Sequence, residues 1–182
     1  IDLELDGTSP APLFSARLVS ENALASELLK GFTGHDWLSG PLRADISLSG
    51  FGTSVAAIVS TLKGAATFKA ENGALSHVDG KALVASVTQE IVEGWGADGV
   101  TPFTAFAGSF TIADGIAETT DLKFTGNGIT VEASGHVDLL RRAVDLTALP
   151  AIAMGGDKMV GLPVPVVIRG PWRAPRIYPD VA

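Results

Sequence analysis

The chain has 182 residues, a formal net charge of −7 and a charged fraction of only 18 %. Its apolar fraction of 46 % excludes a disordered chain, and its Lys and Arg residues are too scattered to form the basic face that nucleic acids require. Cysteine is absent, which excludes disulfides, thiolate metal sites and thiol nucleophiles. At roughly 150 residues per domain, the length indicates a single domain over residues 1–182.

The first six residues alternate apolar and acidic side chains, which predicts a strand that starts at Ile1. Such a start indicates a piece of a longer protein, whose export signal or membrane anchor lies outside these residues. The acids Asp2, Glu4 and Asp6 also resemble the opening of a calcium loop. That loop needs a bidentate Glu at its twelfth position, which is occupied here by Leu13. We therefore interpret the three acids as the solvent-exposed face of the strand.

Helical spacing of apolar residues is confined to three segments, which predicts helices over residues 20–30, 53–62 and 80–93. Phe103 and Phe106, which follow Pro102, indicate a short helical turn. The residues that mark the ends and the apolar faces of the first two helices are Ser20, Leu24, Leu28, Leu29 and Gly31, then Thr53, Ser54, Val55, Ile58, Val59, Leu62 and Gly64.

Period-2 alternation is the dominant pattern and predicts strands over residues 42–49, 129–139, 144–148 and 162–168. In the second of these, the odd-numbered residues are apolar or glycine and the even-numbered ones are polar, which predicts that the odd-numbered face is buried. Pro165 lacks an N–H, so its strand should lie at a sheet edge or at the margin of the sheet.

Turn dipeptides separate these strands, and each favours the positive φ angles of a type I′ hairpin. We therefore predict an antiparallel meander over residues 108–149, a loop over 150–161 and an extended tail over 170–182. No apolar run approaches the ~18 residues of a membrane span. The three dipeptides are Asn72-Gly73, Asp114-Gly115 and Asn127-Gly128.

Local motifs for catalysis or cofactor binding are weak. Residues 94–99 satisfy G-x-G-x-x-G, but a predicted helix precedes them and Thr101-Pro102 follows, whereas the dinucleotide site needs a strand before and a helix after. The histidines His35, His77 and His136 lie far apart and form no metal or general-base pair. We therefore assign no catalytic, cofactor-binding or metal-binding residue and expect no cofactor.

These patterns together predict an α+β, β-rich fold: a curved, largely antiparallel sheet with two or three helices packed against it. The apolar face of this sheet has two interpretations. It is either an ordinary core covered by the helices, or it stays partly open as a groove for lipid or for a partner strand.

The order of the segments resembles the C-terminal region of the AsmA family of bacterial envelope proteins. Three stretches carry this resemblance and together extend from about residue 28 to residue 180. They are Leu28-Leu29-Lys30-Gly31 through Leu62-Lys63-Gly64 to Asn72-Gly73-Ala74-Leu75; Thr101-Pro102-Phe103 with Gly108-Ser109-Phe110 to Gly115, Asp121-Leu122 and Gly135 to Leu139; and Leu162-Pro163 to Trp172 with Pro175 and Pro179-Asp180.

The resemblance implies a periplasmic protein held to the inner membrane by an N-terminal helix, in a family linked to outer-membrane protein assembly and envelope lipid homeostasis. We therefore expect a non-enzymatic domain whose partners are phospholipids or acyl chains, or other envelope proteins, but not nucleic acid. Two alternatives stay open: an interaction module that pairs through an exposed edge strand, and a hydrolase whose site is assembled from distant residues.

Overall fold

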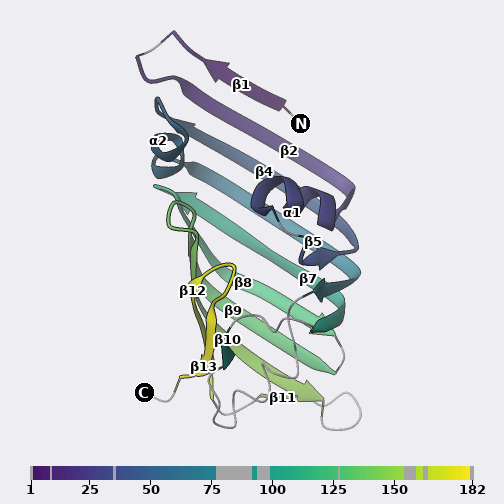
Figure 1. Cartoon of the computed structure of the whole chain (residues 1–182). Helices are drawn as coiled ribbons and strands as arrows, with labels where there is room; N and C mark the ends of the chain where they lie inside the picture. Colours follow the sequence, from purple (N-terminus) through teal and green to yellow (C-terminus); the bar gives the residue numbers. More distant parts are fainter. Residues whose placement is uncertain are drawn as a thin grey trace.

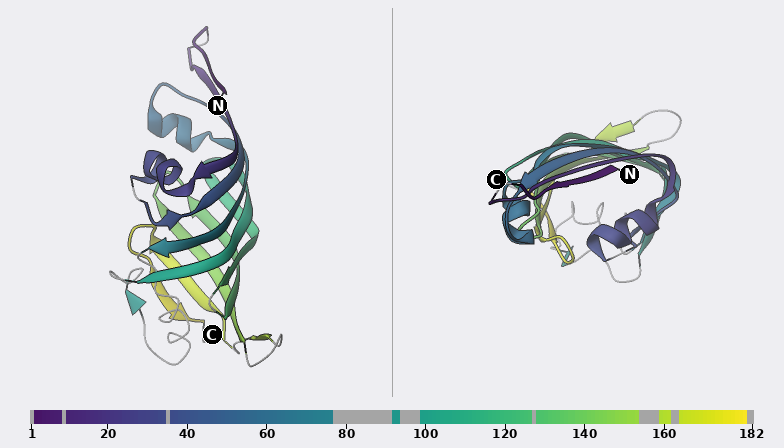
Figure 2. Two further views of the ribbon diagram at one scale, coloured as in Figure 1. Left: turned by 90° about the vertical axis from the view of Figure 1, so that its right-hand side faces the viewer. Right: turned by 90° about the horizontal axis from the view of Figure 1, so that it is seen from above.

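One curved antiparallel sheet dominates the chain (Figures 1 and 2). The computed structural model describes residues 2–8, 10–34, 36–76, 92–93, 99–126, 128–153, 159–161 and 164–180. Within them the sheet has 13 strands in the order β1-β2-β4-β5-β7-β8-β9-β10-β12-β13-β6, with β3 paired to β5 and β11 paired to β10. The strands are β1 (Asp2–Asp6), β2 (Leu13–Leu24), β3 (Leu38–Ser39), β4 (Pro41–Phe51), β5 (Lys63–Ser76), β6 (Val92–Glu93), β7 (Val100–Ala113), β8 (Ile116–Gly126), β9 (Ile129–Asp138), β10 (Ala143–Ala153), β11 (Met159–Gly161), β12 (Val166–Pro171) and β13 (Arg176–Pro179).

Alternation along the strands gives the sheet one apolar and one polar face. In β4, Leu42 and Ala44 are buried, whereas Arg43 and Asp45 are exposed. The predicted strand over residues 129–139 is confirmed as β9, whose odd-numbered residues from 131 to 137 are buried or half-buried and whose even-numbered residues from 132 to 136 are exposed. The apolar face lines the concave side of the sheet, where helix α1 (Ala25–Thr33) lies (Figure 2).

Two of the three predicted hairpin turns are confirmed. Asp114 and Gly115 have φ angles of 49° and 75°, as a type I′ turn requires, and they join β7 to β8. Gly128, with φ 74°, lies between β8 and β9, while Asn127 lies outside the described residues. The strands β7, β8, β9 and β10 pair antiparallel in chain order, so the predicted meander is also confirmed.

The third predicted hairpin, at Asn72-Gly73, is wrong because β5 runs unbroken from Lys63 to Ser76. Asn72, not Gly73, has the positive φ, at 50°. This left-handed residue shifts the alternation of β5 by one, since Ala70 and Leu75 are buried in the same cluster although they are five residues apart. Glycine is needed at position 73 because a Cβ there would meet the Ser39 carbonyl oxygen of β3.

The neighbouring strand β7 explains a second wrong prediction. Phe103 and Phe106 lie in a strand rather than a helical turn. Both nevertheless pack in the same cluster, with ring centroids 6.1 Å apart, because the alternation of β7 also shifts between them. The i, i+3 spacing that indicates a helix thus arises here from an irregular strand.

Helix α1 begins five residues later than predicted. Residues 20–24 extend β2, which pairs with β4 as far as Leu24, so backbone pairing overrides the helical spacing of the leucines. The helix continues past Gly31 and ends at Gly34, whose φ of 75° and N–H bond to the Lys30 carbonyl form a left-handed cap. Leu28 and Leu29 pack against the concave core, as their spacing predicts.

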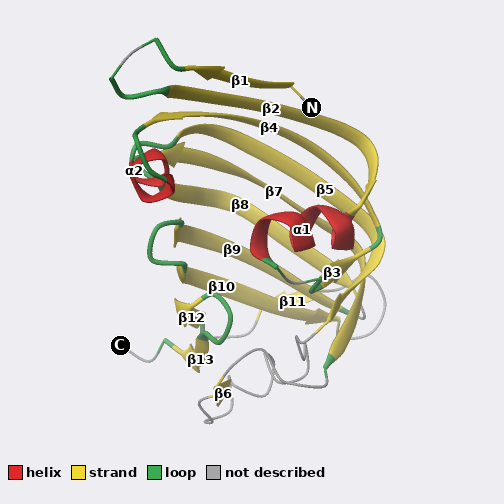
Figure 3. Cartoon of the chain, turned by 45° about the horizontal axis from the view of Figure 1, so that its top comes forward, coloured by secondary structure: helices red, strands yellow, loops and turns green. Residues whose placement is uncertain are grey.

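Helix α2 (Val55–Ser60) is confirmed with its predicted Ser54 cap, whose hydroxyl accepts a hydrogen bond of 3.2 Å from the Ala57 N–H. It lies at the rim of the sheet, has no buried residue, and leaves Val55 79 % exposed (Figure 3). The predicted helix over residues 80–93 lies outside the described residues except for its end, which forms strand β6. The described chain therefore has two short helices, and only α1 packs on the apolar face.

The C-terminal predictions are confirmed in part. The predicted loop over residues 150–161 is wrong where the structure describes it, because β10 continues to Ala153 and pairs there with β11 at Met159–Gly161; residues 154–158 lie outside the described part. Pro165 immediately precedes β12, so it lies at the margin of the sheet, and its carbonyl accepts a hydrogen bond from the Asp180 N–H. The predicted extended tail contains β13, which pairs with β12.

Candidate functional site

The concave face of the sheet is the candidate functional site. Cross-strand pairing lines up apolar residues from six successive strands in one row, and parallel rows flank it. In the described parts of β4, β5, β7, β8, β9 and β10, no Asp, Glu, Lys, Arg or His points to this side. The row consists of Leu42, Ala70, Phe106, Phe124, Val131 and Pro150.

Five phenylalanines form the floor of this face. Phe68 meets Phe106 edge to face with centroids 5.1 Å apart and stacks on Phe110 at 6.4 Å. Phe103 meets Phe124 edge to face at 5.9 Å, and both of these rings are buried. Phe68, Phe106 and Phe110 are only half-buried, so each of them keeps some solvent-accessible surface.

Only part of the concave face is covered by the described residues. Leu28 and Leu29 of α1, together with Trp37, pack over the cluster that contains Phe103. At the N-terminal edge of the sheet, described residues no longer cover the concave face. Leu3 and Leu5, which pair with Ala16 and Phe14, are each 70 % exposed there. The apolar side chains at this end are therefore open to a ligand.

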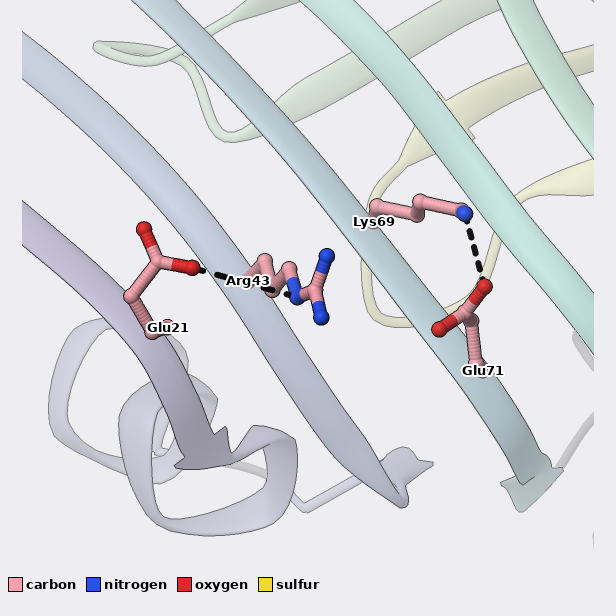
Figure 4. A network of polar contacts seen from close by, with 4 residues as sticks. All are labelled: Glu21, Arg43, Lys69 and Glu71. Carbon is pink, nitrogen blue, oxygen red and sulfur yellow. Dashed lines mark ion pairs between the residues drawn. The ribbon is translucent and has the colours of Figure 1, made fainter.

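The convex face has the opposite character. Five ion pairs of described residues lie across it, and their side chains are exposed, with Asp145 the least exposed at 34 %. Figure 4 shows four of these residues on β2, β4 and β5. The same four residues line a hollow of about 310 Å³. Hydrogen bonding to Lys69, with the Nζ–Oε1 distance at 2.6 Å, lowers the pKa of Glu71. Such exposed pairs keep this face in water and contribute little stability. They are Arg17–Asp45, Arg43–Glu21, Lys69–Glu71, Lys123–Glu132 and Arg169–Asp145.

The Asp121 side chain accepts hydrogen bonds at an irregularity in the pairing of β8 with its neighbouring strands. The register of β8 shifts between Thr119 and Leu122, so β8 carries one residue more than β9 there. The Asp121 carboxylate accepts hydrogen bonds from the Ser109 N–H at 2.8 Å and from the Ser109 hydroxyl at 2.7 Å. These two bonds, with a weaker one from Thr119, lower the pKa of Asp121. Ser109 and Asp121, both within the stretches that carry the family resemblance, thus have a structural role.

Those residues weighed for chemistry that the structure describes do not come together. Asp2, Glu4 and Asp6 alternate along β1, as the strand interpretation predicts. His136 is exposed on the convex face of β9, opposite Glu118 and Asp145; this lateral row of polar groups cannot be predicted without the register. His35, His77 and residues 94–98 lie outside the described residues. Among those described, no group of three His, Asp or Glu is placed to hold a metal ion.

Comparison with known proteins gives one match. A model of the AsmA family matches residues 2–122, which run from β1 into β8 and include the phenylalanines of β5 and β7. No curated protein and no solved structure matches the chain. The described helices are all too short or too polar to cross a membrane.

Proposed function

The chain belongs to the AsmA family, and from this membership and the geometry of the concave face we propose that it is a non-enzymatic domain of the bacterial envelope that binds the acyl chains of lipids. The observation that carries the proposal is the apolar concave face, which has no charged group in the described strands β4 to β10. Most of its central row is buried, whereas Phe68, Phe106 and Phe110 are half-buried and Leu3 and Leu5 at the N-terminal edge are exposed. Family membership supports the envelope setting, and the chemistry of the face supports the class of ligand.

The physical basis is the burial of apolar surface. An acyl chain gains roughly 0.8 kcal/mol for each CH₂ removed from water, so eight carbons gain about 6 kcal/mol before the costs of association. Because the described part of this face carries no charged group, no ion loses its hydration when the chain binds there. The polar headgroup would stay at the solvent side, because the concave rows offer it no ionic partner.

The proposed location is the periplasm, with attachment to the inner membrane through a segment outside these residues. In that setting the domain would take part in envelope lipid homeostasis and in outer-membrane protein assembly, the processes with which the family is linked. Both statements are supported by the family membership.

A fluorescent fatty-acid titration with a matched pair of variants tests acyl-chain binding. Ala66 is half-buried on the concave side, where it packs near Leu48 and Phe110, and its neighbour Thr67 is exposed on the convex side. We expect saturable binding to the wild type, binding weakened at least about tenfold in Ala66→Glu, and unchanged binding in Thr67→Glu, because only the first places a charge against the acyl chain. No saturable binding up to millimolar ligand, or equal effects of the two variants, would contradict the proposal.

A further inference from the structure

Two turns at one rim of the sheet lie side by side and bring three arginines together. Residues 139–142 join β9 to β10, and residues 172–175 join β12 to β13. Strands β10 and β12 pair where the two turns meet, and the Trp172 N–H donates a hydrogen bond of 2.9 Å to the Arg142 carbonyl. We call the large exposed side chains of these turns the arginine rim, and they are Leu140, Arg141, Arg142 and Arg173.

The arginine rim is positive although the whole chain has a net charge of −7. Neither turn contains an acidic residue, and no ion pair between described residues involves Arg142 or Arg173. Arg141 lies 3.7 Å from Asp138, but its side chain stays 83 % exposed. A second carboxylate, Asp114, is exposed in the neighbouring turn between β7 and β8. Three guanidiniums thus exceed the two carboxylates of the described residues on this part of the rim.

The sheet holds both turns in place. Trp172 packs against the core cluster that contains Val144 and Ile168, and Pro175 is almost completely buried. Arg142 has a left-handed φ of 55°, and the hydrogen bond to its carbonyl stabilises this conformation. Because the backbone is already ordered, the arginines lose only side-chain freedom when they bind a ligand.

Exposed apolar side chains continue along the same rim. The Leu139 N–H donates to the Gly115 carbonyl, and the Gly115 N–H donates to the Leu62 carbonyl just after α2. The arginine rim and α2 therefore share one edge of the sheet, on the left of Figure 3. Along this edge Leu140 is 50 % exposed and Val55 of α2 is 79 % exposed. The edge thus combines accessible cations with accessible apolar groups.

We propose that the arginine rim binds the surface of a bilayer that contains anionic phospholipid. Its guanidiniums would bind lipid phosphates, because a planar guanidinium forms paired hydrogen bonds with phosphate oxygens. Leu140 would enter the boundary between headgroups and acyl chains, as apolar residues do in segments that lie on a membrane surface. A soluble anion would leave Leu140 and Val55 in water, whereas a bilayer engages both kinds of group. This contact is independent of acyl-chain binding by the concave face.

Cosedimentation of the whole chain with lipid vesicles tests the proposal at about 100 mM salt, where surface charges are only partly screened. One set of vesicles is pure phosphatidylcholine, and the other contains about 30 % phosphatidylglycerol. We expect the wild type to bind the phosphatidylglycerol vesicles at least about tenfold more tightly, because only these attract the three guanidiniums to a negative surface.

Two triple variants separate the arginine rim from the other exposed cations of the chain. The rim variant is Arg141→Gln with Arg142→Gln and Arg173→Gln. The control variant, which removes three exposed cations elsewhere and changes the net charge equally, is Lys30→Gln with Arg43→Gln and Lys123→Gln. We expect the rim variant to bind phosphatidylglycerol vesicles at least about tenfold more weakly than the wild type, and the control variant to stay within about twofold.

Two single variants test the apolar contact and separate this proposal from acyl-chain binding. Leu140→Asn should weaken binding to phosphatidylglycerol vesicles about threefold, because it removes the apolar group that enters the bilayer. Ala66→Glu, on the concave face, should leave vesicle binding unchanged. If the fatty-acid titration fails while vesicles still bind through the rim, only acyl-chain binding is contradicted; the reverse result contradicts only the bilayer contact.

A measurement on the unchanged chain guards against misfolded variants. Hydrogen–deuterium exchange should show that phosphatidylglycerol vesicles slow exchange of backbone amides within residues 139–142 and 172–174. Equal binding to the two kinds of vesicle, equal losses in the two triple variants, no effect of Leu140→Asn, or no protection of these two turns would each overturn the proposal.

Discussion

At the scale of single residues, the bond between Asp121 and Ser109 has the clearest consequence. Removal of the carboxylate in Asp121→Ala leaves the Ser109 N–H without its acceptor at the register shift. We expect a loss of about 1 kcal/mol in the free energy of unfolding, measured by urea denaturation at pH 7. Glu118→Ala, at an exposed carboxylate in the same strand, is the control and should change stability by less than about 0.5 kcal/mol.

The hydrogen bonds between Ser109 and Asp121 also predict that the stability contributed by Asp121 depends on pH. Hydrogen bonds from Ser109 hold the folded-state pKa of Asp121 below its ordinary value of 3.8. The stabilisation is therefore fully present above that ordinary value and is lost as the pH falls through the lower, folded-state pKa. The stability difference between wild type and Asp121→Ala should stay constant from pH 7 to about pH 5 and shrink below pH 4. A difference that grows on acidification would show that the carboxylate does not carry the effect.

Two glycines with nearly the same φ angle allow two costs of a Gly→Ala substitution to be compared: the strain of a positive φ angle and a steric clash of the new Cβ. Gly115 and Gly128 have φ angles of 75° and 74°. A Cβ at Gly115 would lie 2.5 Å from the Val59 carbonyl oxygen of α2, whereas a Cβ at Gly128 would have nothing closer than 4.0 Å. We expect Gly128→Ala to cost about 1 kcal/mol and Gly115→Ala at least about 1 kcal/mol more, in thermal or urea unfolding. Equal costs would mean that the turn moves freely away from α2.

At the scale of elements, β9 tests which face of the sheet is buried. Val131 belongs to the packing of two core clusters, and Glu132 is exposed in an ion pair with Lys123 at 2.8 Å. Val131→Asp should cost several kcal/mol, because it places an unpaired charge in the concave core, while Glu132→Lys should cost less than about 1 kcal/mol. Two equally mild changes in thermal melts would show that the assigned register is wrong.

Elements with regular alternation could be predicted from the sequence, and elements that depend on their neighbours could not. The alternation of β4 and β9 and the Asp114-Gly115 turn are local signals, and the structure contains all three. The start of α1 is not local, because residues 20–24 pair with β4 instead of starting the helix. Asn72-Gly73 has the composition of a hairpin turn, but β5 continues through it, with Gly73 close to the Ser39 carbonyl.

At the scale of the whole molecule, the sheet separates charge from apolar surface. The convex ion pairs Arg17–Asp45 and Lys123–Glu132 join residues whose strand neighbours point into the concave face, so regular alternation produces both surfaces there. The existence of an apolar face could be predicted from the sequence. Its extent could not, because the cover provided by α1 and the position of α2 at the rim depend on the curvature of the sheet.

The central claim is that this concave face binds acyl chains, and photo-crosslinking tests it most directly. A fatty acid with a diazirine near its methyl end is bound to the purified chain, irradiated, and the modified residues are identified by mass spectrometry. We predict adducts at concave residues such as Phe68, Phe106 and Phe110, which are half-buried on the floor of the face, and their loss in Ala66→Glu but not in Thr67→Glu. Adducts spread equally over convex residues such as Arg43 and Lys69, or unaffected by Ala66→Glu, would contradict the account.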